Sequence, residues 1–488
     1  MSGKPVYHIT FSLIILLLWG GVNAQKSQVS NGVKLNSKVS NFKVLGKVGD
    51  KFVVERYGNN THILDVYNTG LKNQMSRQIL LNKNEFIETI WLQANSGWII
   101  RVKNDKTTNY LIASKLDERI SISQKPVILD SIVERKDLLQ ANLRTKLSLN
   151  ESNILIYAPI FSKGEVNYFY TRVYDINMQL ISEKLIKEPS LLDYDFVKVI
   201  VLNDGSYLFI SKQDGGEDPA VYYFNYVKRD GTLSKFQFTP VKNVFKKLEF
   251  QVDNLNHALF ISGFFRARIE NKRDKNGASE FFTTKLDLDN FQTQYTEIVP
   301  FTDDFYLKLT SKTSARTPPQ LFTFYIHSLI PQIDGGALVF TESYFKTEES
   351  NVSDSYFSLG GVANYNYSTI YNFNDIVVYH LDSTGHCIQQ EIVRKKQISR
   401  NDGGSFSSFY VFNSQNQLQM MFLDEIDRYT HLSAAPVIDE VETESKSILN
   451  IGNKNVFPIM KMSKQTAPNE LLIPSYNRNK MQLIKMTF

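Results

Sequence analysis

Several carboxylates in the chain could serve acid–base chemistry. They occur as close pairs or singly: Asp193 and Asp195, Asp303 and Asp304, Glu342, Asp424, Glu425 and Asp427. Two carboxylates at a suitable separation are sufficient for glycoside cleavage. Acidic residues are also common in β-turns, however, and spacing along the chain does not bring any two of them together. No catalytic residue is assigned from the sequence.

His380, His386 and Cys387 lie close together across an expected hairpin and could form part of a metal site. A zinc site requires three or four ligands, and a lone cysteine is more simply a small buried hydrophobic residue. The chain contains no Gly-rich phosphate loop, no Gly-x-Ser-x-Gly motif and no His-Glu-x-x-His motif. The sequence therefore predicts no metal and no cofactor.

The most distinctive segment is residues 344–373, where aromatic residues alternate with Asn, Ser and Gly. Tyrosine in such a setting offers a large, stiff contact area at a low entropic cost, as in antibody loops. The alternative is that these rings cover the apolar rim of their own sheet, or that the segment forms an extra hairpin. We hypothesise that a ligand or partner is bound by four of these tyrosines: Tyr356, Tyr365, Tyr367 and Tyr371.

The elements that would position these residues show a repeat. A Gly, Asn or Asp turn followed directly by an apolar run occurs eight times, and its turn residues are Asp50, Gly97, Asn153, Gly205, Asn256, Gly336, Asn416 and Asn469. The two widest gaps end at Gly336 and at Asn416. Long insertions are expected around 344–373 and in the 385–416 unit.

A second kind of turn, acidic or Asn-rich, follows within most repeats, as in residues 381–385 (Leu-Asp-Ser-Thr-Gly). Each unit then reads as four short antiparallel strands. Four-stranded units at this period are typical of propeller blades, whereas a sandwich needs only seven to nine strands in all. The sequence predicts an all-β protein, a single β-propeller with eight blades favoured and seven as the fallback.

The two ends of the chain are expected to close this ring. Residues 480–488 form an apolar-rich strand, and residues 29–38 could pair beside it. Closure by the termini would hide strand edges that otherwise invite aggregation.

The first 24 residues follow the plan of a signal peptide. Lys4 precedes an apolar run over residues 9–19, and Val22-Asn23-Ala24 supplies small residues for cleavage before Gln25. The apolar run is about half of the ~20 residues that a membrane-spanning helix needs, and no second long apolar stretch follows. The expected domain is therefore residues 25–488, exported to the periplasm or outside the cell.

The net charge and the cysteine content exclude one class of partner and one kind of cross-link. The formal net charge of +5 is too small to indicate nucleic-acid binding, and the single cysteine, Cys387, excludes an internal disulfide. A basic loop at 266–275 could meet an acidic partner, although such a run is usually a solvated hairpin tip.

Residues 374–397 and 402–408 are similar to segments of uncharacterised exported proteins of Bacteroidota with blade-like repeats. This resemblance implies export and a propeller fold. It implies no activity, so no functional residue is carried over.

Taken together, these features favour an exported, non-catalytic binding or scaffold propeller with a protein or polysaccharide partner. A propeller hydrolase acting on glycans or peptides is the alternative. A transmembrane β-barrel is the third, because apolar residues alternate up to the terminal Phe488. Barrel strands should be polar on one face, however, and residues 199–202 are apolar on both.

Overall fold

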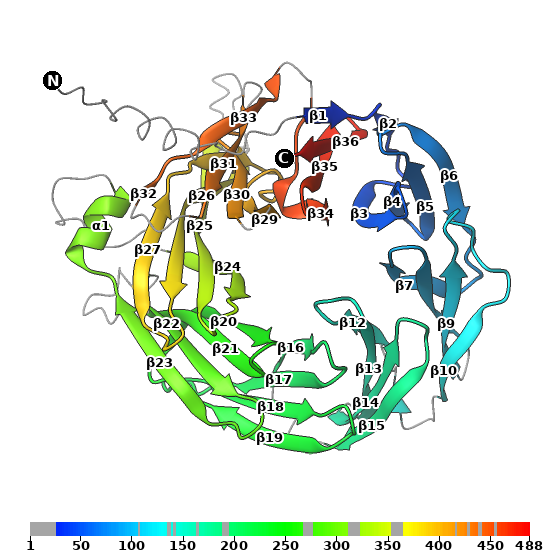
Figure 1. Ribbon diagram of the computed structural model, residues 1–488, viewed down its shortest axis with the longest axis horizontal. Helices are drawn as coiled ribbons and strands as arrows, with labels where there is room; N and C mark the ends of the chain where they lie inside the picture. The colour runs from blue at the N-terminus through cyan, green and yellow to red at the C-terminus, as the bar shows by residue number, and fades with distance from the viewer. Residues whose placement is uncertain are drawn as a thin grey trace, which may run out of the picture.

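The computed structural model describes residues 26–105, 108–133, 138–139, 143–162, 165–187, 195–266, 277–310, 323–352, 365–414, 417–426, 430–437, 442–452 and 456–488. These residues form eight sheets, antiparallel except for one short parallel pair, arranged as blades around a ring (Figure 1). The prediction of an eight-bladed, all-β propeller is confirmed. No helix in the described part of the chain is long and apolar enough to cross a membrane.

The first four blades follow one another along the chain. Blade 1 contains β3 (Asn41–Val48), β4 (Lys51–Gly58), β5 (Thr61–Tyr67) and β6 (Asn73–Ile79). Blade 2 contains β7 (Glu85–Leu92), β8 (Gly97–Asn104), β9 (Thr108–Leu116) and β10 (Val127–Val133). Blade 3 contains β12 (Arg144–Leu147), β13 (Asn153–Ser162), β14 (Glu165–Asp175) and β15 (Leu180–Lys187), with β11 (Leu138–Leu139) also on β13. Blade 4 contains β16 (Asp195–Val201), β17 (Tyr207–Gln213), β18 (Val221–Val227) and β19 (Leu233–Phe238).

The remaining blades complete the ring. Blade 5 contains β20 (Val244–Asp253), β21 (Ala258–Arg266), β22 (Ala278–Asp287) and β23 (Thr293–Pro300). Blade 6 contains β24 (Phe324–Pro331), β25 (Ala337–Val352), β26 (Tyr365–Leu381) and β27 (Cys387–Val393), with β28 (Gln397–Arg400) and β32 (Glu442–Thr443) added. Blade 7 contains β29 (Phe409–Ser414), β30 (Gln417–Leu423), β31 (His431–Pro436) and β33 (Lys446–Asn450). Blade 8 contains β34 (Lys464–Ala467), β35 (Glu470–Asn477), β36 (Lys480–Thr487) and β1 (Lys26–Val29), with β2 (Val33–Lys34) also on β36.

The repeated turns explain why each blade folds locally. Each of the eight turn residues singled out in the sequence precedes or begins the second strand of a blade. The acidic turns lie between the third and fourth strands, where one carboxylate oxygen accepts backbone hydrogen bonds from residues ahead of it. Asp382 Oδ1 accepts from Thr384 N at 2.9 Å and His386 N at 3.0 Å, and Asp230 Oδ1 accepts from Thr232 N at 2.8 Å. A short polar side chain of this kind stabilises a tight turn without help from the rest of the chain.

The chain termini close the ring, as the sequence predicted. In blade 8, β1 pairs with β36 from Lys26 opposite Thr487 to Val29 opposite Ile484. The segment that pairs begins earlier than residue 29, and β2 supplies only a second, short contact at Val33 and Lys34. The N-terminal strand is thus the outer strand of a blade whose inner three strands come from the C-terminus.

The core consists of apolar layers between neighbouring blades. Phe224 of blade 4 lies 5.8 Å from Phe250 of blade 5, measured between ring centroids. Phe281 of blade 5 stacks on Tyr379 of blade 6 at 4.0 Å. Phe412 of blade 7 contacts the terminal Phe488 at 4.5 Å. Because both faces of a blade are covered in this way, inner strands are apolar on both faces rather than alternating.

One face of the ring, here called the turn face, carries the turns between first and second strands and those between third and fourth strands. Backbone and amide groups tie these turns together from blade to blade. Asn153 Nδ2 donates to Asn203 O at 2.8 Å, and Asn203 N donates to Asn254 Oδ1 at 2.7 Å. Gly49 N donates to Ala94 O at 2.6 Å. These bonds fix the rim of the turn face.

The described part of the chain has one α-helix, α1 (Asp303–Thr310), between blades 5 and 6. Its last carbonyl groups are bound by Arg394, which donates to Leu309 O at 3.0 Å and to Lys308 O. A cation at the carboxyl end of a helix is favourable because the helix dipole is negative there. The sequence shows no helical periodicity over these eight residues. The contact that fixes the end of the helix comes from Arg394, which directly follows β27 and is remote in the chain.

Candidate functional site

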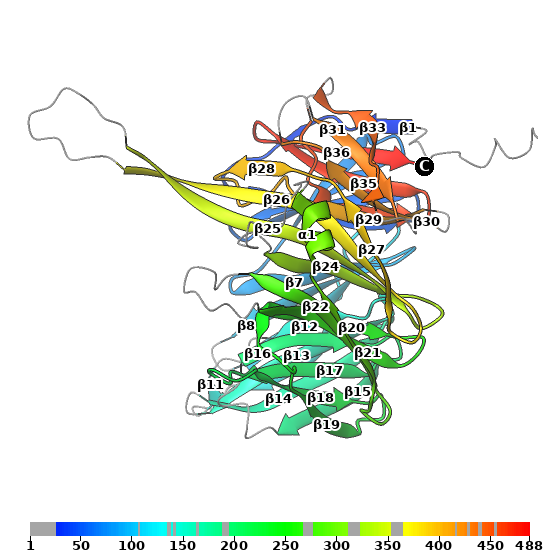
Figure 2. The same ribbon diagram turned by 90° about the vertical axis from the view of Figure 1, so that its left-hand side faces the viewer.

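The second and third strands of blade 6 run far past the ring on the face opposite the turn face (Figure 2). We call the projecting part the arm: residues 344–352 of β25, residues 365–373 of β26, and β28. The two long strands stay paired from Tyr344 opposite Phe373 to Val352 opposite Tyr365. The short strand β28 then pairs with β26 at the base. The aromatic segment 344–373 therefore forms a hairpin, with a third strand at its foot.

The four proposed tyrosines have different environments. Tyr367 is 69 % exposed on the arm, and Tyr371 is partly buried on the same face, nearer the base. Tyr365 begins β26, but nothing is described of its side chain, and Tyr356 lies outside the described residues. The structure thus places Tyr367 and Tyr371 on one surface and leaves the role of all four as a prediction.

At the foot of the arm, aromatic rings become core. Phe373 is only 8 % exposed, and its ring centroid lies 4.6 Å from that of Tyr344. Gly404 approaches this ring so closely that a Cβ there would lie 2.5 Å from Phe373 Cε2, and the Gly404 φ of +67° lies in the left-handed region that favours glycine. The arm surface and the arm base therefore carry aromatic residues with opposite roles.

A buried ion pair lies beneath the base of the arm. Lys395 Nζ is 2.6 Å from Glu342 Oε1, and neither side chain is exposed. The same ammonium donates to Phe373 O at 3.2 Å and to Gln397 Oε1 at 3.1 Å. Burial lowers the pKa of Lys395, while the charge of Glu342 acts in the opposite direction. A buried charge is tolerated when it is paired and hydrogen-bonded in this way.

Both oxygens of the Glu342 carboxylate accept hydrogen bonds. Its Oε2 accepts from Ser408 Oγ at 2.7 Å and from Tyr325 OH. Gln397, which accepts from Lys395, links the ion pair to blade 7 because its Nε2 donates to Leu423 O at 2.6 Å. Glu342 was one of the carboxylates considered for catalysis, and its oxygens are instead engaged in holding the arm, blade 6 and blade 7 together.

The other candidate carboxylates are dispersed. Asp303 and Asp304 lie in the first turn of α1, where Asp304 pairs with Lys308 at 2.6 Å. Asp195 begins β16, and Asp424 and Glu425 follow β30. Asp193 and Asp427 lie outside the described residues. The described members thus come from four separate elements: β16, α1, β25 and the end of β30.

The histidine and cysteine group does not form a ligand set. His380 Nε2 lies 3.0 Å from Glu391 Oε2, and His386 Nδ1 lies 3.6 Å from Glu297 Oε2. Burial raises the pKa of Cys387 to about 12, so its thiol is not activated. Within the described ranges, no cluster of three or more His, Cys, Asp or Glu residues could hold a metal ion. Of the basic loop at 266–275, only Arg266 is described.

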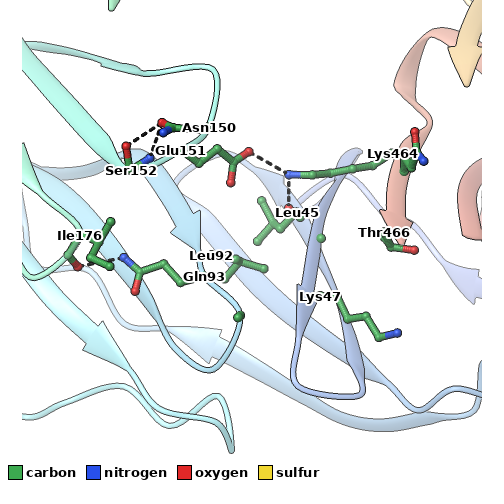
Figure 3. Close-up of a pocket in the computed structure, with 13 residues that line it drawn as sticks. Leu45, Lys47, Leu92, Gln93, Asn150, Glu151, Ser152, Ile176, Lys464 and Thr466 are labelled. Carbon is green, nitrogen blue, oxygen red and sulfur yellow. Dashed lines mark hydrogen bonds and ion pairs between the residues drawn. The ribbon is translucent and has the colours of Figure 1, made fainter. Parts of the chain in front are cut away.

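A cavity of ≈ 430 Å³ opens at the turn face, and Figure 3 shows the residues that line it. It is lined by inner strands and rim turns of blades 1, 2, 3 and 8. Lys464 of blade 8 donates to Leu45 O of blade 1 at 2.8 Å and lies 3.6 Å from Glu151 Oε1 of blade 3. The side chain of Lys464 thus crosses the cavity between blades that are not neighbours.

Sequence reasoning missed both the ion pair at the arm base and this cavity. Lys395 stood in an unremarkable basic run, and Lys464 in a short polar strand. A signal existed only for the arm, through its dense tyrosines. The pairing partners in the other two cases are remote in the chain and give no local pattern.

No protein-family model matches the chain, and the curated proteins include no match. Solved structures with some similarity include a protein of unknown function from Bacteroides caccae, with 12% identity over 72% of this chain and 92% of that chain and a TM-score of 0.27. The Dos1 propeller has 9% identity over 94% of this chain and 95% of that chain, with a TM-score of 0.46. The polysaccharide lyase Uly1 has 9% identity over 94% and 99%, with a TM-score of 0.37. Similarities at this level carry no argument about function.

Proposed function

We propose that this chain is an exported, non-catalytic binding propeller that holds a protein partner on its arm. The observation that carries the proposal is the 69 % exposed Tyr367 on a projecting hairpin whose base is fixed by a fully buried ion pair. An exposed aromatic ring on a rigid support loses little entropy on binding, which favours its use as an anchor.

The strand edges of the arm favour a polypeptide partner over a polysaccharide. In the described part of the chain, β24 pairs with β25 only up to Ser343, and the outer edge of residues 346–352 has no neighbouring strand. Backbone groups on such an edge can be matched by an added strand of another protein. Lys346 and Glu348 are exposed along it, and charged residues on an edge restrict which strands can add.

The distribution of carboxylates supports a non-catalytic role. Catalytic acids and bases need access to substrate, whereas Glu342 is fully buried and occupied by Lys395, Tyr325 and Ser408. Asp304 lies 2.6 Å from Lys308 in an exposed pair on its own helix. The buried contacts of Glu342 are typical of a structural network.

Export is proposed from the leader at residues 1–24, which lies outside the described residues. The small residues Val22-Asn23-Ala24 precede Gln25, and the ring begins directly afterwards with β1 at Lys26. Cleavage before Gln25 would leave the closing strand intact.

Site-specific photo-crosslinking in the producing cells tests the proposed function. A photoreactive phenylalanine analogue replaces Tyr367 in one strain and Ile333 in the other. Ile333 is a matched control because it is 88% exposed but belongs to a turn-face turn. We expect a discrete protein adduct from position 367 and none of the same mass from position 333. Identical adducts at both positions, or an adduct at 367 that polysaccharide-degrading enzymes remove, would overturn the proposal.

A further inference from the structure

The cavity at the turn face is a second potential binding site, independent of the arm. Its two lysines come from different blades, Lys47 from blade 1 and Lys464 from blade 8, and Gln93 and Asn150 add amide groups from blades 2 and 3. We propose that this cavity binds an acidic sugar, with Lys464 pairing to the sugar carboxylate.

The ammonium group of Lys464 is positioned to bind an anion. It is held by the 2.8 Å bond to Leu45 O, whereas the contact with Glu151 is longer, at 3.6 Å. The Lys464 and Glu151 side chains remain 38% and 45% exposed. An ion pair this open contributes little stability. Glu151 therefore lies where a ligand carboxylate would bind, and its contact with Lys464 is weak enough for a ligand carboxylate to displace it.

Lys47 is not available in the same way. It pairs with Glu470 at 3.3 Å, and that carboxylate is only 12% exposed. Glu470 also accepts from Thr466 Oγ1 at 2.8 Å. The better-buried partner keeps Lys47 in place, so Lys464 is the cation that a ligand would recruit.

The remaining lining suits a sugar. The volume of ≈ 430 Å³ falls within the range typical of small-molecule sites. Ile176, which is 41% exposed, offers apolar surface to ring C–H groups, while Leu45 and Leu92 line the wall but are buried. Gln93 Nε2 donates to Ile176 O at 2.9 Å, and Asn150 Oδ1 accepts from Ser152 Oγ. Asn150 Oδ1 also accepts from Ser148 Oγ and Ser152 N, so the capacity that sugar hydroxyls can use lies in the amide N–H groups of Asn150 and Gln93.

Calorimetric titration of the mature protein with galacturonic acid, with galactose as the uncharged probe, tests this inference. We expect galacturonic acid to bind and galactose to bind at least about tenfold more weakly, which corresponds to ~1.4 kcal/mol. Lys464→Met should abolish galacturonate binding. Glu151→Gln should strengthen it by up to about fivefold, because it removes a competing carboxylate. Lys43→Met makes the same charge change on β3 at an exposed position outside the cavity and should have no effect.

Three results would overturn the inference. The first is no galacturonate binding by either the unmodified protein or Glu151→Gln. The second is an equal loss of binding in Lys43→Met, which would indicate general charge attraction. The third is equal affinity for acetate, which would show that the sugar ring contributes nothing.

Discussion

Replacing Lys395 by Met tests whether the buried ion pair with Glu342 stabilises the base of the arm. Methionine resembles the lysine stem in length and removes only the ammonium. The carboxylate of Glu342, which is fully buried, would then keep its hydroxyl donors but lose its cation. Phe373 O and Gln397 Oε1 would each lose a donor as well. The change therefore leaves an uncompensated charge beneath the arm.

The expected cost is about 3–5 kcal/mol of unfolding free energy, the range found when one partner of a buried ion pair is removed. The double variant Lys395→Met, Glu342→Gln should recover a large part of this loss, because it removes the buried charge and keeps an amide that can hydrogen-bond to Ser408. A pair this strongly coupled should show a clear deviation from additivity in a double-mutant cycle.

Urea unfolding followed by intrinsic fluorescence measures these differences through the transition midpoint. Lys212→Met is the control, because Lys212 pairs with an Asp214 that is 70% exposed, and it should change stability by less than about 0.5 kcal/mol. A Lys395→Met variant as stable as Lys212→Met would refute the claim that the ion pair fixes the base of the arm.

Four further predictions follow from the same structure. Tyr367→Ala should leave stability within about 0.5 kcal/mol, whereas Phe373→Ala, on the same strand but buried, should cost roughly 3–5 kcal/mol; thermal melting compares the two, and equal losses would contradict the assignment of Tyr367 to the surface. Burial raises the pKa of Tyr207, Tyr222 and Tyr226 to about 12, so the stability they contribute should be complete below about pH 10 and be lost towards pH 12. Phenolate absorbance rising in the folded protein near pH 10 for these residues would disprove this. Deleting residues 480–488 removes the fully buried Met481, Leu483 and Ile484 and should cost several kcal/mol, at roughly 1.5–3 kcal/mol for each side chain; a soluble protein with unchanged melting temperature would contradict closure by the termini. Mass spectrometry of exported protein should find Gln25 at the N-terminus, and retention of residues 1–24 would overturn the proposed cleavage.

The fold was predictable because its signals are local. A turn such as that at Asp230 is stabilised by a bond to a residue two positions ahead, so its pattern can be read in the sequence of most blades. The number of blades followed from counting the eight Gly, Asn or Asp turns that precede second strands. The short helix α1 gave no such signal, since its end is fixed by Arg394, about 85 residues further along the chain.

The candidate sites were predictable only in part. Tyrosine density marked the arm, but the sequence could not distinguish exposed Tyr367 from buried Phe373, because both belong to one alternating run. Lys395 and Glu342 are 53 residues apart, and Lys464 meets Glu151 only because the ring closes. Contacts of this kind depend on tertiary structure and have no period from which to infer them.

The most direct test of the central claim is to remove the arm and keep the ring. Replacing residues 348–369 by Asn-Gly joins Thr347 to Ile370, which already face each other across the hairpin, and Asn-Gly favours the required tight turn. The foot of the arm keeps its pairing with β28. Co-purification from the producing cells, with equal amounts of folded protein confirmed by melting temperature, should recover a stoichiometric protein partner with the intact chain and lose it with the shortened one. An undiminished partner on the shortened, fully folded variant would contradict binding through the arm.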